Sequence, residues 1–188
     1  MFSIYLDLGF DHILDINGYD HILFLVTLCA LYTVREWRPI LILVTAFTIG
    51  HSITLALSAL NIIRMNANLI EVLIPVKILL TALLNLLVTP QPDKPWRPNY
   101  FLALFFGFIH GMGFSTYFKA LLGKEADILT PLFAFNVGVE LGQLCIVAGI
   151  ILINYLFTGL LKLPQRTWTI IVSLMAALLA CYMIIERI

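Results

Sequence analysis

Charged residues are scarce in this chain. Only 12% of its 188 residues are Asp, Glu, Lys or Arg, whereas a soluble domain carries about 25%. The 11 basic residues balance the 11 acidic ones, so no net charge attracts a polyanion. Cysteines are few as well: Cys29, Cys145 and Cys181 form an odd set inside apolar stretches, which is typical of buried side chains rather than disulfides. These shortages exclude a soluble globular protein, a disordered tail and a nucleic-acid binder.

Apolar sequence fills the chain instead. Hydrophobic residues make up 61% of it, and the mean hydropathy is +1.00. Because a membrane span needs about 20 apolar residues and lipid offers no partners for an open backbone, the apolar runs predict transmembrane helices joined by short loops. We therefore predict an all-α membrane protein with a bundle of six transmembrane helices. The expected spans are Tyr19–Val34, Ile40–Leu60, Leu69–Val88, Asn99–Leu122, Leu132–Leu161 and Thr167–Ile185.

The N-terminal segment has a different pattern. Over residues 1–18, apolar side chains recur every three to four positions, and Asp7, Asp11 and Asp15 fall on the opposite face. This periodicity predicts a short amphipathic helix in the membrane interface. We expect residues 1–188 to form a single transmembrane domain, with 1–18 as the interfacial segment and 19–188 as the bundle.

Basic residues predict the orientation, because cytoplasmic loops are rich in Lys and Arg. If both termini are external, the inner loops hold six basic residues and the outer segments hold four. The inner six are Arg35, Arg38, Lys94, Arg97, Lys162 and Arg166, and the outer four are Arg64, Lys119, Lys124 and Arg187. We predict a multi-pass protein surrounded by the lipid bilayer, with both termini on the external or periplasmic side.

Ionisable side chains occur inside the expected spans, where each costs about 2.5–3.5 kcal/mol near the bilayer centre. The acidic groups and histidines are Asp20, His21, His51, Glu71, His110 and Glu140. His51 and His110 each follow a Trp-Arg-Pro triplet by the same spacing, about 18 Å of helix beyond Pro39 and Pro98. The matching triplets indicate a repeat of 37–88 and 96–157, and the shared depth brings the six residues to one level.

Imidazoles and carboxylates at one level are ligands for Ni²⁺, Co²⁺ or Zn²⁺. We therefore predict that the six residues bind a divalent metal ion, while other polar groups hydrogen-bond to the ligands and orient them. These orienting groups are His12, Ser52, Asn136 and Gln143. A network of carboxylate–imidazole pairs without metal remains an alternative. Lys77 is expected to be a structural counter-charge, since an ammonium group repels a cation.

The same residues carry a family resemblance. The chain resembles the HupE/UreJ family of small bacterial membrane proteins in segments that run from the N-terminus to the fifth expected span. These segments are Gly18-Tyr19-Asp20-His21-Ile22-Leu23-Phe24, His51-Ser52-Ile53-Thr54-Leu55, His110-Gly111-Met112-Gly113-Phe114 and Phe135-Asn136-Val137-Gly138-Val139-Glu140-Leu141-Gly142-Gln143. The resemblance implies nickel handling at the bacterial inner membrane, as a metal permease or accessory protein, with contacts to other membrane proteins. Pro75 and Lys77 in the third span depart from the family pattern.

Two functions therefore compete. The first is binding and transport of a divalent transition metal. The alternative is an intramembrane metal-dependent hydrolase whose site opens to the external side, with Glu71 or Glu140 as general base. A third possibility is an assembly subunit whose polar cluster is structural. Below the predicted cluster the spans contain no Asp, Glu or His, so the site resembles a cup open to one side.

Overall fold

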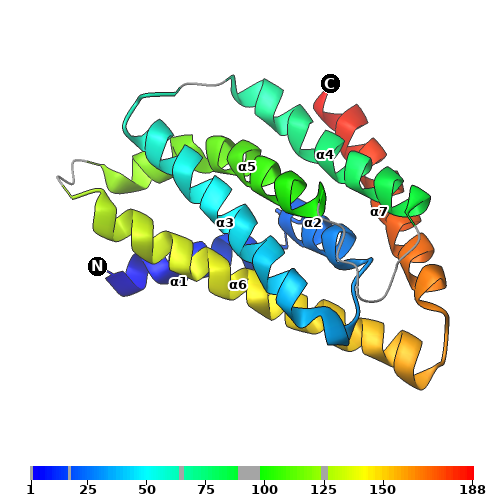
Figure 1. The fold of residues 1–188 in the computed structure, drawn as a ribbon. Helices are drawn as coiled ribbons and strands as arrows, with labels where there is room; N and C mark the ends of the chain where they lie inside the picture. The colour runs from blue at the N-terminus through cyan, green and yellow to red at the C-terminus, as the bar shows by residue number, and fades with distance from the viewer. Residues whose placement is uncertain (1, 17, 64–65, 89–97, 124–126) are drawn as a thin grey trace.

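The computed structural model describes residues 2–16, 18–63, 66–88, 98–123 and 127–188, and Figure 1 shows their arrangement. Across these residues the chain is helical and contains no strand, which confirms the all-α prediction. The helices in chain order are α1 (Phe2–Leu14), α2 (Asp20–Cys29), α3 (Trp37–Ala59), α4 (Ala67–Leu87), α5 (Pro98–Leu122), α6 (Leu129–Tyr155) and α7 (Gln165–Arg187). A 3-10 turn, Val34–Glu36, precedes α3, and a π-helical turn, Leu156–Leu160, extends α6.

Helices α3 to α7 are long and apolar enough to cross a membrane. They coincide with the second to sixth expected spans to within a few residues at each end. The expected first span is different, because its helix α2 ends at Cys29 after 10 residues. A count of six spans therefore remains a prediction.

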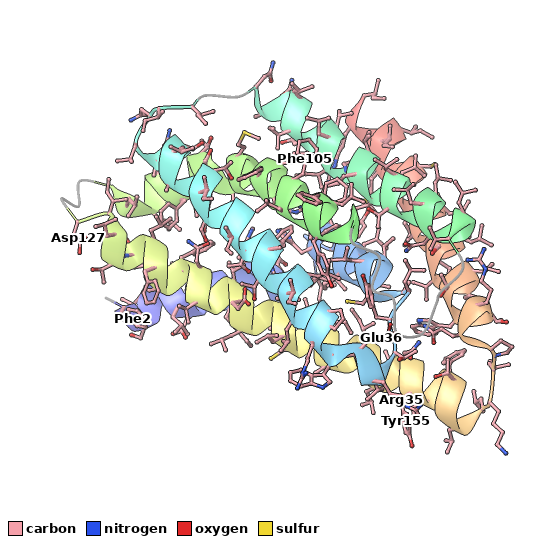
Figure 2. The ribbon with its side chains drawn as sticks, viewed as in Figure 1. Phe2, Arg35, Glu36, Phe105, Asp127 and Tyr155 are labelled. Carbon is pink, nitrogen blue, oxygen red and sulfur yellow. The ribbon has the colours of Figure 1, made fainter. Side chains whose placement is uncertain are left out.

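Side-chain contacts define the two ends of the bundle. At one end Lys119 donates to Asn61 over 3.0 Å, and Arg187 donates to the carbonyl of Glu71 over 2.9 Å. Phe2 and Asp127 lie at this end, which we call the terminal end, and Arg35, Glu36 and Tyr155 lie at the opposite end (Figure 2). At the opposite end Arg166 donates to the carbonyls of Asn85 and Val88 in the last turn of α4, over 2.9 and 2.5 Å. Both chain ends therefore share one end of the bundle.

Helix α1 packs along α6 from the terminal end to its middle. The ring of Phe2 lies 6.4 Å from that of Phe133, and Ile13 packs against Gly142 in the middle of α6. A Cβ on Gly9 would overlap the carbonyl oxygen of Phe135, so the two backbones touch. Such close approach is typical of packed membrane helices. The placement of α1 in the membrane interface remains a prediction.

Helix α2 continues from this middle level toward the opposite end. Near its end, the carbonyl of Thr27 accepts a hydrogen bond of 2.7 Å from Asn85, close to the end of α4. The carbonyl of Ala30 accepts one of 3.2 Å from Gln165 at the start of α7. Helices α1 and α2 together therefore run the length of the bundle in two pieces, with the break between Leu14 and Asp20 at mid-depth.

Three phenylalanines fill the core next to this break, on the side toward the opposite end. The ring of Phe24 in α2 lies 5.3 Å from that of Phe47 in α3 and 5.4 Å from that of Phe106 in α5. All three rings are almost completely buried. Helices α3 and α5 approach closely here, because a Cβ on Gly107 would overlap the carbonyl oxygen of Phe47. We call these three rings the aromatic floor, since the histidines lie on their terminal side.

Candidate metal centre

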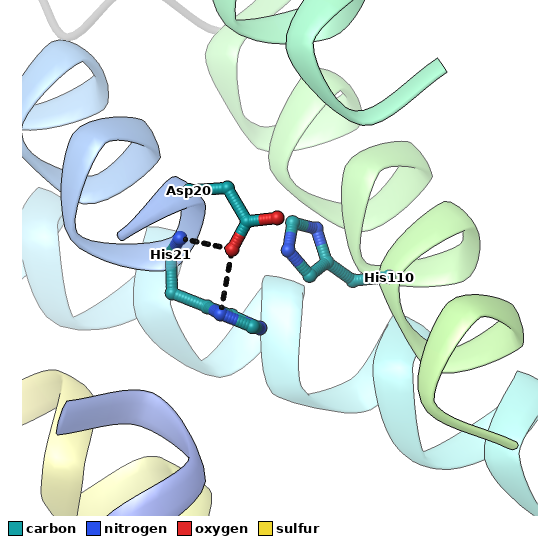
Figure 3. A group of neighbouring side chains, drawn as sticks. All are labelled: Asp20, His21 and His110. Carbon is teal, nitrogen blue, oxygen red and sulfur yellow. Dashed lines mark hydrogen bonds and ion pairs between the residues drawn. The ribbon is translucent and has the colours of Figure 1, made fainter. Parts of the chain in front are cut away.

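Asp20, His21 and His110 meet at the start of α2. Each offers a ligand atom, and these atoms lie within 4.8 Å of one another (Figure 3). The Oδ1 atom of Asp20 accepts a hydrogen bond of 2.9 Å from the backbone N–H of His21 and lies 3.1 Å from Nδ1 of the same residue. The side chain of Asp20 is 13% exposed and that of His21 is 8% exposed, so the group is sheltered from solvent.

All four histidines of the chain lie in one row that joins α1, α2, α3 and α5. Ring centroids are 4.2 Å apart for His110 and His21, 4.6 Å for His21 and His12, and 6.3 Å for His12 and His51. The Nε2 atom of each ring is buried and has no hydrogen-bond partner among the described residues. A buried polar atom without a partner costs about 1–3 kcal/mol, so four in one row favour a bound ion or ordered water at this place.

The other ring nitrogens of three of these histidines lie close to polar neighbours. Nδ1 of His51 lies 3.3 Å from Oδ1 of Asn136. The amide nitrogen of Asn136 donates to the carbonyl of Leu132 over 2.8 Å, so its Oδ1 accepts and the His51 Nδ1 donates. Oδ1 of Asp20 lies 3.1 Å from Nδ1 of His21, at ion-pair distance, but that nitrogen makes no hydrogen bond among the described residues. Because a neutral imidazole carries one proton, the His51 ring keeps a free lone pair at Nε2, as in metal-ligating histidines with an oriented second nitrogen.

The third such contact is to a lysine. Nζ of Lys77 in α4 makes a hydrogen-bond contact with Nδ1 of His110. Lys77 is 2% exposed, and its Nζ lies 5.0 Å from the ring centre of Phe24 and 5.7 Å from those of Phe47 and Phe106. The aromatic floor therefore surrounds a cation that is tethered to the histidine row.

A cavity of about 280 Å³ connects the row to the terminal end. Its lining includes His12, Asp20, His21, His110 and Glu71. A second cavity of about 790 Å³ shares His12 and Asp15 with it and adds Asp11. Asp11, Asp15 and Glu71 are exposed. The approach to the histidines is thus acidic, and it starts from the terminal end.

The predicted site residues occupy three places. Asp20, His21 and His110 form the compact group, and Glu71 lines the same cavity. His51 and Asn136 pair beside it, as expected for an orienting amide. Glu140 bonds to Thr45 and Thr48 on α3, and Ser52 bonds to the carbonyl of Thr48. Gln143 lies 3.4 Å from the Thr48 hydroxyl.

Sequence reasoning missed one contact at this centre. Nη2 of Arg187, near the end of α7, lies 3.9 Å from Oδ2 of Asp20. His12 was expected as an orienting group beside the ligands, and it lies within the row itself, although its helix was expected in the interface. Its position one turn after Gly9, which touches α6, is the sequence signal that placed it inside. Arg187 carries no signal beyond its charge at a helix end.

These features define a class: a multi-pass helical membrane protein with a histidine-rich group suited to a metal ion. The family model described as HupE / UreJ protein matches residues 1–187, and the chain belongs to this family. The resemblance seen in the sequence is thereby confirmed. The family is related to nickel and cobalt transport in membranes. No curated protein and no solved structure is significantly similar to the chain.

Proposed function

We propose that the protein binds a divalent transition-metal ion, Ni²⁺, Co²⁺ or Zn²⁺, at the histidine row and moves it into the bacterial cell. The observation that carries this proposal is the set of four buried Nε2 atoms without partners. Imidazole nitrogens suit these borderline ions better than they suit Mg²⁺ or Ca²⁺. The metal-free network of carboxylate–imidazole pairs would leave these four nitrogens unsatisfied, which argues against it.

His21, through Nε2, and His110 are the central ligands in this proposal. Because an ammonium donor at Nδ1 leaves the His110 ring proton on Nε2, the Lys77–His110 pair gives up one proton when His110 binds the ion. The ligand atoms of His21 and His110 belong to the compact group, and His12 and His51 extend the row on one side. Asp20 pairs with the His21 ring at Nδ1 and adds negative charge beside the ion. Glu71 lies on the cavity wall, where it attracts cations toward the row.

The membrane topology in this proposal has six crossings. In place of the expected interfacial position, α1 here forms the first crossing together with α2. Helix α1 is about 20 Å long and α2 about 15 Å, at 1.5 Å per residue, so the two pieces together match a hydrocarbon core of about 30 Å. Broken helices that meet at mid-membrane are a feature of ion sites in transporters. The terminal end is external, because Arg35, Arg38, Lys162 and Arg166 gather at the opposite end and basic residues favour the cytoplasm.

Metal analysis of the purified protein tests the binding function. The protein is prepared without a histidine tag, and bound Ni²⁺, Co²⁺ and Zn²⁺ are measured by mass spectrometry and by equilibrium titration. We expect about one ion per chain, and its loss in the His21→Ala, His110→Ala double variant. Asp7→Asn, an exposed change on α1, is the control. Full occupancy in the double variant would show that the ligands lie elsewhere.

One observation favours the hydrolase as a second candidate. Glu71 lines the same cavity as the histidines and is exposed, so its carboxylate shares the space in which a general base would act on metal-bound water. A hydrolase needs metal and Glu71 but no movement of the ion across the membrane. Uptake of ⁶³Ni²⁺ into proteoliposomes therefore separates the two functions, because only the transporter moves the ion inside.

A further inference from the structure

The carboxylate of Glu140 lies outside the histidine row, between α3 and α6. Its Oε1 accepts a hydrogen bond of 2.8 Å from Thr45 Oγ1, and its Oε2 accepts one from Thr48 Oγ1. No basic side chain forms a salt bridge with it in the part of the chain that the structure describes. An intramembrane carboxylate without a basic partner is a functional-site candidate.

Oxygen atoms outnumber the available protons at this place. The Thr48 hydroxyl lies next to two acceptors, Oε2 of Glu140 and the carbonyl of Val44 at 3.2 Å, and the side-chain amide of Gln143 lies 3.4 Å away. The hydroxyl has one hydrogen and can donate to only one of the two acceptors. Gln143 is 1% exposed, so water does not reach it freely. A cation among these oxygens would satisfy all of them and neutralise the carboxylate.

The position of this oxygen cluster relates it to the histidine row. Asn136, which holds His51, and Glu140 are one turn apart on α6, and Thr48 is one turn from His51 on α3. Because α6 runs toward the opposite end, Glu140 lies beyond His51 in that direction. Phe47, in the same turn of α3, belongs to the aromatic floor. The oxygen cluster therefore lies beside the aromatic floor. An ion that moved toward the opposite end could contact these oxygens instead of crossing the three apolar rings.

We propose that Glu140, Thr45, Thr48 and Gln143 form a second cation site, which receives the divalent metal ion after the histidine row. This inference rests on the proposed function. Carboxylate, hydroxyl and amide oxygens bind borderline metals more weakly than imidazoles do, so the second site suits release. Thr45 is exposed at the surface of the bundle and lies about 12 Å of helix from Trp37 at the opposite end. The site thus supplies a carboxylate and two hydroxyls about one helical turn farther toward the opposite end than His51.

Paired binding and uptake measurements test this second site. Reconstituted wild type, Glu140→Gln and Thr45→Val are compared for Ni²⁺ affinity and for ⁶³Ni²⁺ uptake, with Asp7→Asn as the control. We expect Glu140→Gln to bind Ni²⁺ within twofold of wild type and to lose at least tenfold in uptake rate. Thr45→Val removes one oxygen at an exposed position, and we expect it to lower uptake severalfold. This variant still tests the second site if Glu140→Gln misfolds.

A second arm detects the site without transport. Mn²⁺ prefers oxygen ligands, so the His21→Ala, His110→Ala variant still binds it weakly in electron paramagnetic resonance titrations, and adding Glu140→Gln removes that binding. Three results would overturn the second site. Glu140→Gln could take up Ni²⁺ at the wild-type rate, or it could lose the tightly bound Ni²⁺ ion. Alternatively, Mn²⁺ binding could be the same with and without the Glu140→Gln change. A wild-type protein that binds Ni²⁺ but never transports it would overturn the second site as well. A wild-type protein that binds no transition metal would instead overturn the proposed function.

Discussion

Lys77 touches Nδ1 of His110 from inside the aromatic floor, so its ammonium group takes the lone pair of that nitrogen and leaves the ring proton on Nε2. The ammonium group thus lies beside the metal centre and is held there by a hydrogen bond and three ring faces. Two positive charges at such separations repel by several kcal/mol in a medium of intermediate dielectric. If the proposed function holds, this charge lowers the affinity of the centre for a metal ion and so favours its release.

Removal of this charge tests its effect on affinity. Lys77→Met keeps the length of the side chain and deletes the ammonium group, so we expect Ni²⁺ to bind at least roughly tenfold more tightly, equal to about 1.4 kcal/mol. Isothermal titration of the purified variant measures the change. Lys119→Met, at the terminal end beside Asn61, is the matched control. An unchanged Ni²⁺ affinity in Lys77→Met would show that Lys77 does not repel the bound ion.

Asp20 is expected to act on the metal mainly through His21. Its Oδ1 lies 3.1 Å from the Nδ1 of that ring, and groups in this role contribute about 10- to 100-fold in metal affinity. Asp20→Asn should lower Co²⁺ affinity by that amount while the number of ions bound stays the same, as followed by the visible spectrum of bound Co²⁺. A spectrum with one ligand fewer would instead make Asp20 a direct ligand.

The touching helix pairs predict which glycines tolerate a side chain. A Cβ on Gly138 would overlap the carbonyl oxygen of Leu6, and one on Gly107 would overlap that of Phe47. Alanine at either position should destabilise the protein by about 1–3 kcal/mol, as overpacking does. Gly149→Ala is the control, because nothing lies within 4 Å of a Cβ there. Thermal unfolding in detergent compares the three variants, and equal melting temperatures would contradict the close packing.

The external position of the terminal end can be measured by labelling. Single cysteines at Asn66 and Asp127 should react with an impermeant reagent in intact cells, because both lie in exposed connections at the terminal end. A cysteine at Lys162, exposed at the opposite end, should react only after the membrane is opened. The background replaces Cys29, Cys145 and Cys181 by alanine. If the cysteine at position 162 reacted in intact cells, the predicted orientation would be wrong and the opposite end would be external.

The long helices could be predicted from the sequence because hydropathy reports them directly. Helices α3 to α7 begin and end within a few residues of the expected spans. The first two helices could not be predicted in the same way. The amphipathic pattern of residues 1–18 is the same for a helix on a lipid surface and for one packed on α6. Only the contacts of Gly9 and Gly138 show that α1 lies against a neighbouring backbone.

Depth along the helices placed three of the four histidines, His21, His51 and His110, at one level, but it did not specify the rotation of each helix. Spacing placed His51, His110 and Glu140 at one level. The direction of each side chain depends on the crossing angles of helices that the sequence does not specify. The structure therefore brings His110 to His21 and Glu140 to Thr45. For the same reason the depth argument could not place His12, whose helix had no assigned depth.

The glycine contacts bring α1 against α6 and α3 against α5 so closely that we expect each pair to move as one piece. The histidine row crosses between these pieces, since His12 belongs to the first pair while His51 and His110 belong to the second. A rocking motion that separates the pairs would draw His12 and the amide of Asn136 away from the other rings. The number of nitrogens around an ion would then fall without any change inside either pair, so the hold on the ion depends on how far the pairs stand apart.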